Sequence, residues 1–183
     1  RIPVTAGLGG GSSDAAAGLR LANEPRPEPL TAPRLHALAG ELGADVPFFL
    51  AEGPQLGTGD GTELSPVEIA SDYTVVVVLP AGVQKASTAS VYEAFSGADG
   101  FGERRAALER ALEAGDIAAL PANDLASSPV AHELKELGAF RADVSGAGPA
   151  VYGLFAEEER AEAARAALAN RGQTWLTKPA WYG

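Results

Sequence analysis

The sequence predicts an α+β fold, and three observations lead to that prediction. A glycine-rich loop near the start of the chain runs directly into an alanine-rich segment of helical character. Four consecutive valines lie in the stretch Tyr73 to Leu79, which has the length and the β-branched content of a strand. Beyond it, helical and extended segments alternate, and one glycine turn joins two strands. From about residue 70 onward this alternation predicts a two-layer α/β sandwich.

The first part of the chain is expected to begin with a helix. This helix is predicted over residues 13–23, with Ser12 or Ser13 as its N-cap. Asp14 then falls in the first turn, where the helix dipole favours a carboxylate. Residues 24–30 carry three prolines, so this segment is expected to be a surface connection.

A second helix and a region of turns are expected next. Thr31 is the expected cap of this helix and Gly43 its end. The apolar stretch 44–53 is expected to be extended, with Asp45 near its beginning. Residues 57–66 are rich in glycine and are interpreted as turns and as a junction between domains.

The second part of the chain is expected to alternate between helices and strands. A buried strand is predicted over residues 72–80, because β-branched residues favour sheets. The other predicted elements are helices over 87–95, 103–114, 129–137 and 157–170, and strands on either side of the glycine turn 145–149 and over 174–179.

Composition limits the class of protein. The chain has 183 residues, of which 46% are hydrophobic and 21% charged, a profile typical of globular proteins. Its net charge of −10 argues against electrostatic binding of nucleic acid. No apolar run approaches the roughly 20 residues of a membrane-spanning helix, and no cysteine is present to form disulfides or to act as a nucleophile. We expect a soluble, cytoplasmic protein that binds neither membrane nor nucleic acid.

The stretch AGLGGGSSDAAAGLRLAN, residues 6–23, is the first candidate for chemistry. Glycines let backbone N–H groups approach a ligand, and a helix N-terminus adds unpaired N–H groups and partial positive charge. The two serine hydroxyls can add hydrogen bonds or reach Mg²⁺. The stretch is therefore interpreted as a cradle for a nucleotide pyrophosphate, with a flexible linker as the alternative. It lacks the lysine of a Walker A loop and the preceding strand of a dinucleotide-binding fingerprint, so both are rejected.

Two further motifs come later in the chain. Asp45 stands beside the apolar residues VPFF, where partial desolvation would make it usable as a base; a turn or capping aspartate is the alternative. The stretch SGAGP, Ser145 to Pro149, is a second glycine turn, which taken alone is an ordinary tight turn between two strands.

Taken together, these motifs resemble those of the GHMP kinase superfamily of small-molecule kinases. PVTAGLGGGSSDAA is similar to that family's glycine-rich second motif, and DVSGAGPAVYGLF is similar to its third. The triple glycine, with LGADVPFFL, GTGDGTELSP, STASVYEAF and NDL, is most similar to a kinase of non-mevalonate isoprenoid biosynthesis. That resemblance implies phosphorylation, with ATP and Mg²⁺, of a hydroxyl on a cytidine diphosphate-linked polyol. Another GHMP kinase, such as a homoserine or mevalonate kinase, is the alternative.

The resemblance also implies roles for particular residues. Asp45 would take the proton from the substrate hydroxyl, and Thr88 would lie on the substrate side. The turn 145–148 would support the phosphate loop from the second domain. Asp14 would either help to hold Mg²⁺ or repel phosphate, and the metal ligands are not implied. The residues that would wrap the ATP phosphates are Pro3, Ala6, Gly7, Leu8, Gly9, Gly10, Gly11, Ser12 and Ser13.

The fold that the resemblance implies is that of a two-domain GHMP kinase. Residues 1–70 would be the remnant of an S5-like, ATP-binding N-terminal domain, and residues 71–183 would form the C-terminal α/β sandwich. Members of the superfamily carry a further segment ahead of the glycine motif, including a lysine that pairs with the catalytic aspartate. A chain truncated at its N-terminus is therefore expected, with a catalytically inactive nucleotide-binding fragment as a further alternative.

Overall fold

The computed structural model describes residues 2–3, 5–83, 88–95 and 100–180. These residues divide into two compact units. The first unit contains residues 9–68 together with Ile2 and Pro3, and the second contains residues 5–8 together with the described part of 69–180. Each unit has its own hydrophobic core.

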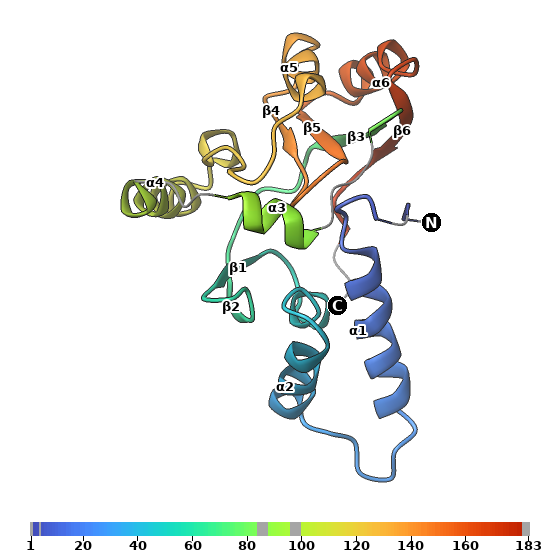
Figure 1. Cartoon of the computed structure of the whole chain (residues 1–183), viewed down its shortest axis with the longest axis vertical. Helices are drawn as coiled ribbons and strands as arrows, with labels where there is room; N and C mark the ends of the chain where they lie inside the picture. Colours follow the sequence, from blue (N-terminus) through green and yellow to red (C-terminus); the bar gives the residue numbers. More distant parts are fainter. Residues whose placement is uncertain (1, 4, 84–87, 96–99, 181–183) are drawn as a thin grey trace. The chain divides into compact units, whose positions relative to one another are not determined.

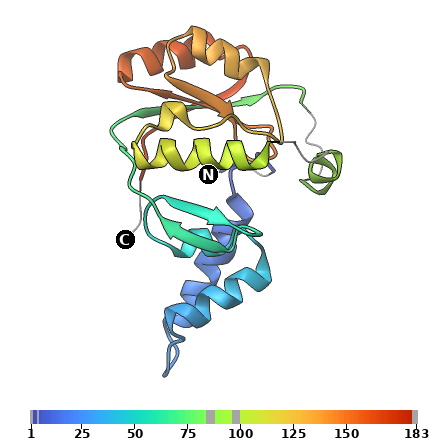
Figure 2. The ribbon, with the colours of Figure 1, turned by 90° about the vertical axis from the view of Figure 1, so that its left-hand side faces the viewer.

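The described part of the first unit contains two helices, a short 3-10 helix and a β-hairpin, whose course can be followed in Figures 1 and 2. Its core is small, with Ala16, Ala39 and Val46 buried where the helices and the 3-10 helix meet. The two strands pair antiparallel, with Thr58 opposite Glu63. The bounds of these elements are α1 (Gly10–Asn23), α2 (Ala32–Leu42), η1 (Pro47–Leu50), β1 (Gln55–Thr58) and β2 (Glu63–Pro66).

The start of α1 differs from the prediction. Gly9 is the N-cap, in a left-handed conformation with φ 66°, and the Ser13 N–H donates to the Gly9 carbonyl at 2.8 Å. Ser12 therefore lies inside the helix with Ser13, and neither caps it, while Asp14 falls beyond the first turn. Glycine adopts a left-handed conformation without a steric penalty, so the helix begins within the glycine run rather than after it.

The stretch 44–53 was expected to be extended, and that prediction is wrong. It contains the 3-10 helix η1, which begins at Pro47 after Val46 in helical conformation. Proline favours the first turn of a helix because its fixed φ is already helical and its missing N–H would have no partner there. The glycine-rich residues 57–66 contain the end of β1, the turn and β2, and a division between the two units falls after Glu68.

The second unit is an antiparallel sheet with helices packed on it, in the strand order β4-β5-β3-β6. Figure 1 shows α5 and α6 side by side over this sheet. The predicted helix over 87–95 corresponds to α3, and its residue 87 lies outside the described residues. The bounds are β3 (Thr74–Pro80), α3 (Thr88–Ala94), α4 (Phe101–Glu113), η2 (Ile117–Ala119), α5 (Pro129–Glu136), β4 (Arg141–Val144), β5 (Val151–Phe155), α6 (Glu158–Ala167) and β6 (Gly172–Thr177).

The core of the second unit lies between the sheet and α5 and α6. Val76 and Val78 of β3 are completely buried, whereas Val75 and Val77 on the other face are half-buried. The predicted strand is thus confirmed, but only one of its faces enters the core. The α+β class and the two-layer arrangement are also confirmed. No helix in the described part of the chain is long and apolar enough to cross a membrane.

Candidate functional site

The glycine-rich loop leads into the N-terminus of α1, which no side chain caps. The first N–H groups of a helix have no intrahelical acceptor, and they carry the positive end of the helix dipole. Gly11 has no atom within 4 Å of the position that a Cβ would occupy, so the space beside this turn is open. An open helix start with uncapped N–H groups is suited to binding a phosphate.

An aromatic ring packs against the loop from within the first unit. A Cβ on Gly9 would lie 2.6 Å from Cζ of Phe49 in η1. The ring of Phe48 meets that of Phe49 edge to face, with centroids 5.2 Å apart. Only glycine fits between this ring and the first turn of α1, so the packing of η1 fixes the conformation of the loop at Gly9.

The second glycine turn contacts the earlier part of the loop, within the second unit. The Ser145 hydroxyl donates to the Gly7 carbonyl at 2.8 Å, and the Ala150 N–H donates to the Ala6 carbonyl at 2.9 Å. A Cβ on Gly7 would lie 2.6 Å from the Ser145 carbonyl oxygen and 2.7 Å from that of Gly148. The 145–148 turn therefore supports the glycine loop through direct backbone contact, as the resemblance implied.

Asp45 lies in the turn between α2 and η1. Its side chain is exposed within the first unit, so the partial desolvation expected from the neighbouring apolar residues is not found there. The side chains of Val46 and Pro47 are buried instead, and Phe49, four residues after Asp45, packs on Gly9. The segment that begins with Asp45 is thereby tied to the start of α1.

The other residues named from the sequence occupy varied positions. Ser12 and Ser13 are half-buried in the first turns of α1, and Asp14 is exposed. Pro3 is half-buried, at the other end of the loop. Thr88 is the first residue of α3, and its side chain lies outside the described part of the structure.

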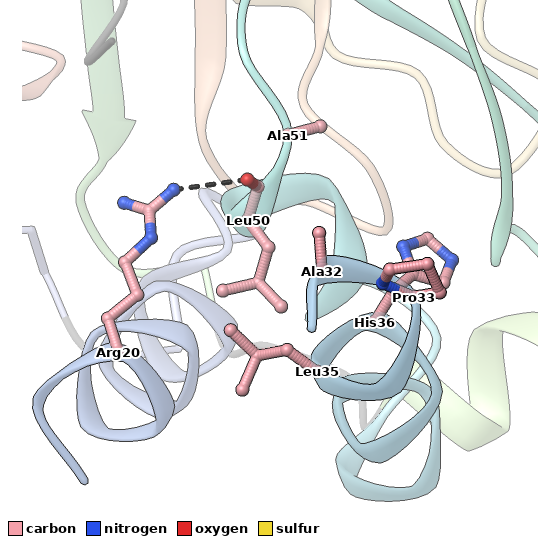
Figure 3. A pocket seen from close by; sticks show the side chains of 7 residues that line it. All are labelled: Arg20, Ala32, Pro33, Leu35, His36, Leu50 and Ala51. Atoms are coloured by element: carbon pink, nitrogen blue, oxygen red, sulfur yellow. Dashed lines mark hydrogen bonds between the residues drawn. The ribbon is translucent and has the colours of Figure 1, made fainter. Parts of the chain in front are cut away.

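A cavity of about 330 Å³ lies in the first unit between α1, α2 and η1 (Figure 3). Leu35 and Leu50 project into it, with Arg20 and His36 at its edges. Arg20 donates to the Leu50 carbonyl at 3.2 Å, and the His36 ring N–H donates to the Thr62 carbonyl at 3.0 Å. Arg20 lies ten residues after Gly10, about 15 Å along the helix, so this cavity is separate from the N-terminal end of α1.

Sequence reasoning gave no role to a polar cluster around Asn123, Arg141 and Asp143. The triplet NDL, which contains Asn123, contributed only to the family resemblance. In the structure the side chains of Arg141 and Asp143 are largely buried and pair at 3.5 Å. A buried charge needs partners. The sequence alone does not reveal that Arg141 and Asp143 pair with each other beside the segment that contains Asn123.

Comparisons with known proteins bear on the family of this chain. Residues 1–53 match the family described as GHMP kinases N terminal domain, and residues 108–174 match GHMP kinases C terminal. A 4-diphosphocytidyl-2-C-methyl-D-erythritol kinase of Chloroherpeton thalassium is 38% identical over 96% of this chain and 66% of that protein. The kinase of the same name from Geobacter sulfurreducens is 39% identical over 96% of this chain and 64% of that protein. The chain thus spans about two thirds of the length of these relatives.

Solved structures extend the comparison. A crystal structure of 4-(cytidine 5'-diphospho)-2C-methyl-D-erythritol kinase matches with a TM-score of 0.76 and 34% identity, covering 97% of this chain and 68% of that one. A homoserine kinase from Cytophaga hutchinsonii has the same TM-score at 18% identity, covering 99% of this chain and 68% of that one, and so shares the fold. On the evidence of both family matches and of a solved relative at 34% identity, the chain belongs to the GHMP kinase family.

Proposed function

We propose that this chain carries the phosphate-binding loop and the base of a kinase that transfers the γ-phosphate of ATP to a hydroxyl of 4-diphosphocytidyl-2-C-methyl-D-erythritol. The observation that supports it most directly is the packing of Phe49 on Gly9, which ties the segment beginning with Asp45 to the open end of α1. The substrate is taken from the names of the relatives at 38% and 39% identity.

In this proposal the backbone of the loop binds the ATP phosphates. N–H groups at the start of α1 donate to phosphate oxygens, and the helix dipole favours their negative charge. The hydroxyls of Ser12 and Ser13 add further donors. The residues proposed to surround the phosphates are Pro3, Ala6, Gly7, Leu8, Gly9, Gly10, Gly11, Ser12 and Ser13.

Asp45 is the proposed base. It accepts the proton of the substrate hydroxyl as that oxygen bonds to the γ-phosphorus, and the bond from phosphorus to the β–γ bridging oxygen breaks to release ADP. We propose that Thr88, at the start of α3, lies on the substrate side. The two family matches lie on either side of the proposed domain boundary after residue 70.

Mg²⁺ is the proposed metal, and it would neutralise the charge of the phosphates. In the described ranges no three His, Asp or Glu side chains gather into a group that could hold a metal ion. We therefore propose that Mg²⁺ arrives bound to the nucleotide and keeps phosphate oxygens and water molecules as ligands, which is usual for this ion.

The decisive experiment measures ATP binding and phosphoryl transfer with the Asp45→Asn variant. We expect ATP to raise the thermal stability of both wild type and variant, and turnover of the polyol substrate to fall about 10²- to 10⁴-fold in the variant. Glu41→Gln removes another exposed carboxylate of the same unit and is the control, which keeps wild-type turnover. Full turnover by Asp45→Asn would refute the assignment of the base.

A second candidate is a nucleotide-binding protein without phosphoryl transfer. It is favoured by one observation, that the side chain of Asp45 is exposed within the first unit rather than partly desolvated. This candidate predicts stabilisation by ATP with no turnover, and no effect of Asp45→Asn on either quantity. Competition between the cytidine diphosphate-linked polyol, homoserine and mevalonate would separate the proposed substrate from those of other GHMP kinases.

A further inference from the structure

Asn123 lies where the segment between η2 and α5 crosses the β4–β5 hairpin. Its backbone N–H donates to Oδ2 of Asp143 at 2.8 Å, and its Oδ1 accepts from the Leu125 N–H at 2.8 Å. Its side-chain nitrogen donates to the Val144 carbonyl at 2.9 Å and to the Gly146 carbonyl at 2.7 Å. All the hydrogen-bonding atoms of this amide are engaged, which fixes both its position and its orientation.

The chain that carries Asn123 is itself held by Arg141. The guanidinium of Arg141 donates to the carbonyls of Leu120 and Pro121, the latter at 2.9 Å, and to the Tyr152 hydroxyl at 3.1 Å. It also pairs with Asp143 at 3.5 Å, and the two side chains are only 11% and 13% exposed. A shielded ion pair with its remaining donors satisfied fixes geometry, because moving either partner would leave a charge without its partner.

The 145–148 turn carries this constraint to the glycine loop. Asn123 holds the carbonyls on both sides of Ser145, whose hydroxyl donates to the Gly7 carbonyl at 2.8 Å. The Gly148 N–H closes the turn by donating to the Ser145 carbonyl at 2.9 Å. The amide of Asn123 therefore fixes the backbone from which the Ser145 hydroxyl reaches the Gly7 carbonyl, although Asn123 makes no hydrogen bond to the loop among the contacts that the structure describes.

We propose that Asn123 is a positioning residue for the glycine loop, acting through Ser145 on the carbonyl of Gly7. Its consequence for nucleotide binding rests on the proposed function, which assigns the loop to the ATP phosphates. Phosphate binding by backbone N–H groups depends on their placement, so a loop released at Gly7 presents its donors less well. Loss of Asn123 should then weaken binding without removing any group that touches the nucleotide.

The test compares Asn123→Asp with Ser145→Ala. Aspartate keeps the acceptor for the Leu125 N–H but loses both donors, and it places an oxygen against the carbonyls of Val144 and Gly146. The Ala150 N–H is the direct probe, because it donates to Ala6 across the contact between turn and loop. We expect its hydrogen exchange to become about tenfold faster in each variant, and the double variant to add little.

Asp116→Ala is the matched control. Asp116 is the N-cap of η2 and accepts from the N–H groups of Ala118 and Ala119. Its loss should leave the exchange of Ala150 and the NMR shifts of Gly7 unchanged. Unchanged Ala150 exchange in Asn123→Asp would overturn the proposal. Faster exchange throughout β3 and β5 would also overturn it, because it would show a merely structural role.

Nucleotide binding separates this proposal from the proposed function. If the wild type binds ATP, we expect a dissociation constant about tenfold higher in Asn123→Asp and in Ser145→Ala, and no change in Asp116→Ala. An unchanged dissociation constant despite faster Ala150 exchange would contradict the proposal. If the wild type binds no ATP while Ala150 exchange responds as expected, the positioning role stands and the proposed function fails.

Discussion

An added methyl group at Gly7 would meet two obstacles at once. The backbone is left-handed there, with φ 79°, and a Cβ would lie 2.6 Å from the Ser145 carbonyl oxygen. We predict that Gly7→Ala lowers the free energy of unfolding by about 2 to 4 kcal/mol, of which roughly 1 to 2 comes from the left-handed conformation and the rest from overpacking. Urea denaturation monitored by circular dichroism measures the change.

Gly115 provides the control for this prediction. It belongs to the same unit and is also left-handed, with φ 65°, but no atom lies within 4 Å of its Cβ position. Gly115→Ala should therefore cost only the conformational part, about 1 to 2 kcal/mol. Equal losses in the two variants would show that the contact between the loop and the 145–148 turn does not form in solution.

Tyr73 gives the protein a dependence on alkaline pH. Burial raises the pKa of Tyr73 above its ordinary value of 10.0, with a smaller contribution from Tyr152, and its ring meets that of Phe140 edge to face. As the pH rises above 10.0, the unfolded chain loses the phenolic proton before the folded chain does. The unfolded state then binds fewer protons, so the free energy of unfolding falls from that pH upward and is unaffected below it.

We predict that Tyr73→Phe reduces this alkaline loss of stability. The measurement is urea denaturation at about pH 8 and about pH 11, on either side of the ordinary tyrosine pKa. Tyr92→Phe, which removes an exposed hydroxyl from α3, is the control. If the free energy of unfolding of Tyr73→Phe falls with pH as much as that of the wild type, the Tyr73 hydroxyl is as accessible in the folded chain as in the unfolded chain.

Among the elements, α1 illustrates what the sequence can and cannot predict. Its helical character follows from the alanine and leucine content, and its end at Asn23 follows from the prolines after it. Its beginning could not be found, because serine is the better N-cap in isolation, but the glycines before the serines can also begin a helix. Gly9 became the cap because the Phe49 ring leaves no space for a side chain there, and that contact is tertiary.

Gly18 in the middle of α1 offers a test at the level of this helix. It is exposed, and no atom lies within 4 Å of its Cβ position. Alanine restricts the unfolded chain and favours the helix, so we predict that Gly18→Ala raises the free energy of unfolding by about 0.5 to 1 kcal/mol. Ala17→Gly, at the neighbouring exposed position, should lower it by a similar amount. A loss of stability in Gly18→Ala would mean that this surface of α1 is covered in solution.

The segments predicted to be strands also show what the local sequence can predict and what it leaves open. The valines of β3 predicted a strand correctly, since β-branched residues leave little doubt about the backbone. The apolar run around Phe48 predicted an extended segment wrongly, because a short apolar run fits a buried strand and a buried helical turn equally well. Pro47, at the first position of η1, was the signal that favoured the helical turn.

For the whole chain, the sequence predicted the family, the motifs and, through the resemblance, that the 145–148 turn supports the loop, but not the hydrogen bonds that make this link. The loop, Asp45 and the 145–148 turn were identified from their residue types and their order. The hydrogen bond from Ser145 to Gly7 joins residues 138 positions apart, and the role of Asn123 appears only when that contact is known. Contacts of this range depend on the packing of the sheet, which a single sequence specifies only as a pattern of buried faces.

The two units differ greatly in the size of their cores. Among the described residues, three buried residues form the core of the first unit, whereas twelve form that of the second. Buried apolar area is the main source of stability, so we predict that amides of α1 and α2 exchange with a lower opening free energy than those of β3 and β5. Native-state hydrogen exchange at increasing urea concentration measures both sets in one sample.

A pair of matched truncations tests whether each core stabilises its own unit. Val46 is 2% exposed in the first core, and Val78 is completely buried in the second. Because a cavity weakens the packing around it, Val46→Ala should speed exchange mainly in α1 and α2, and Val78→Ala mainly in β3 and β5. If either variant accelerates exchange equally in both sets of amides, the chain unfolds as one cooperative body.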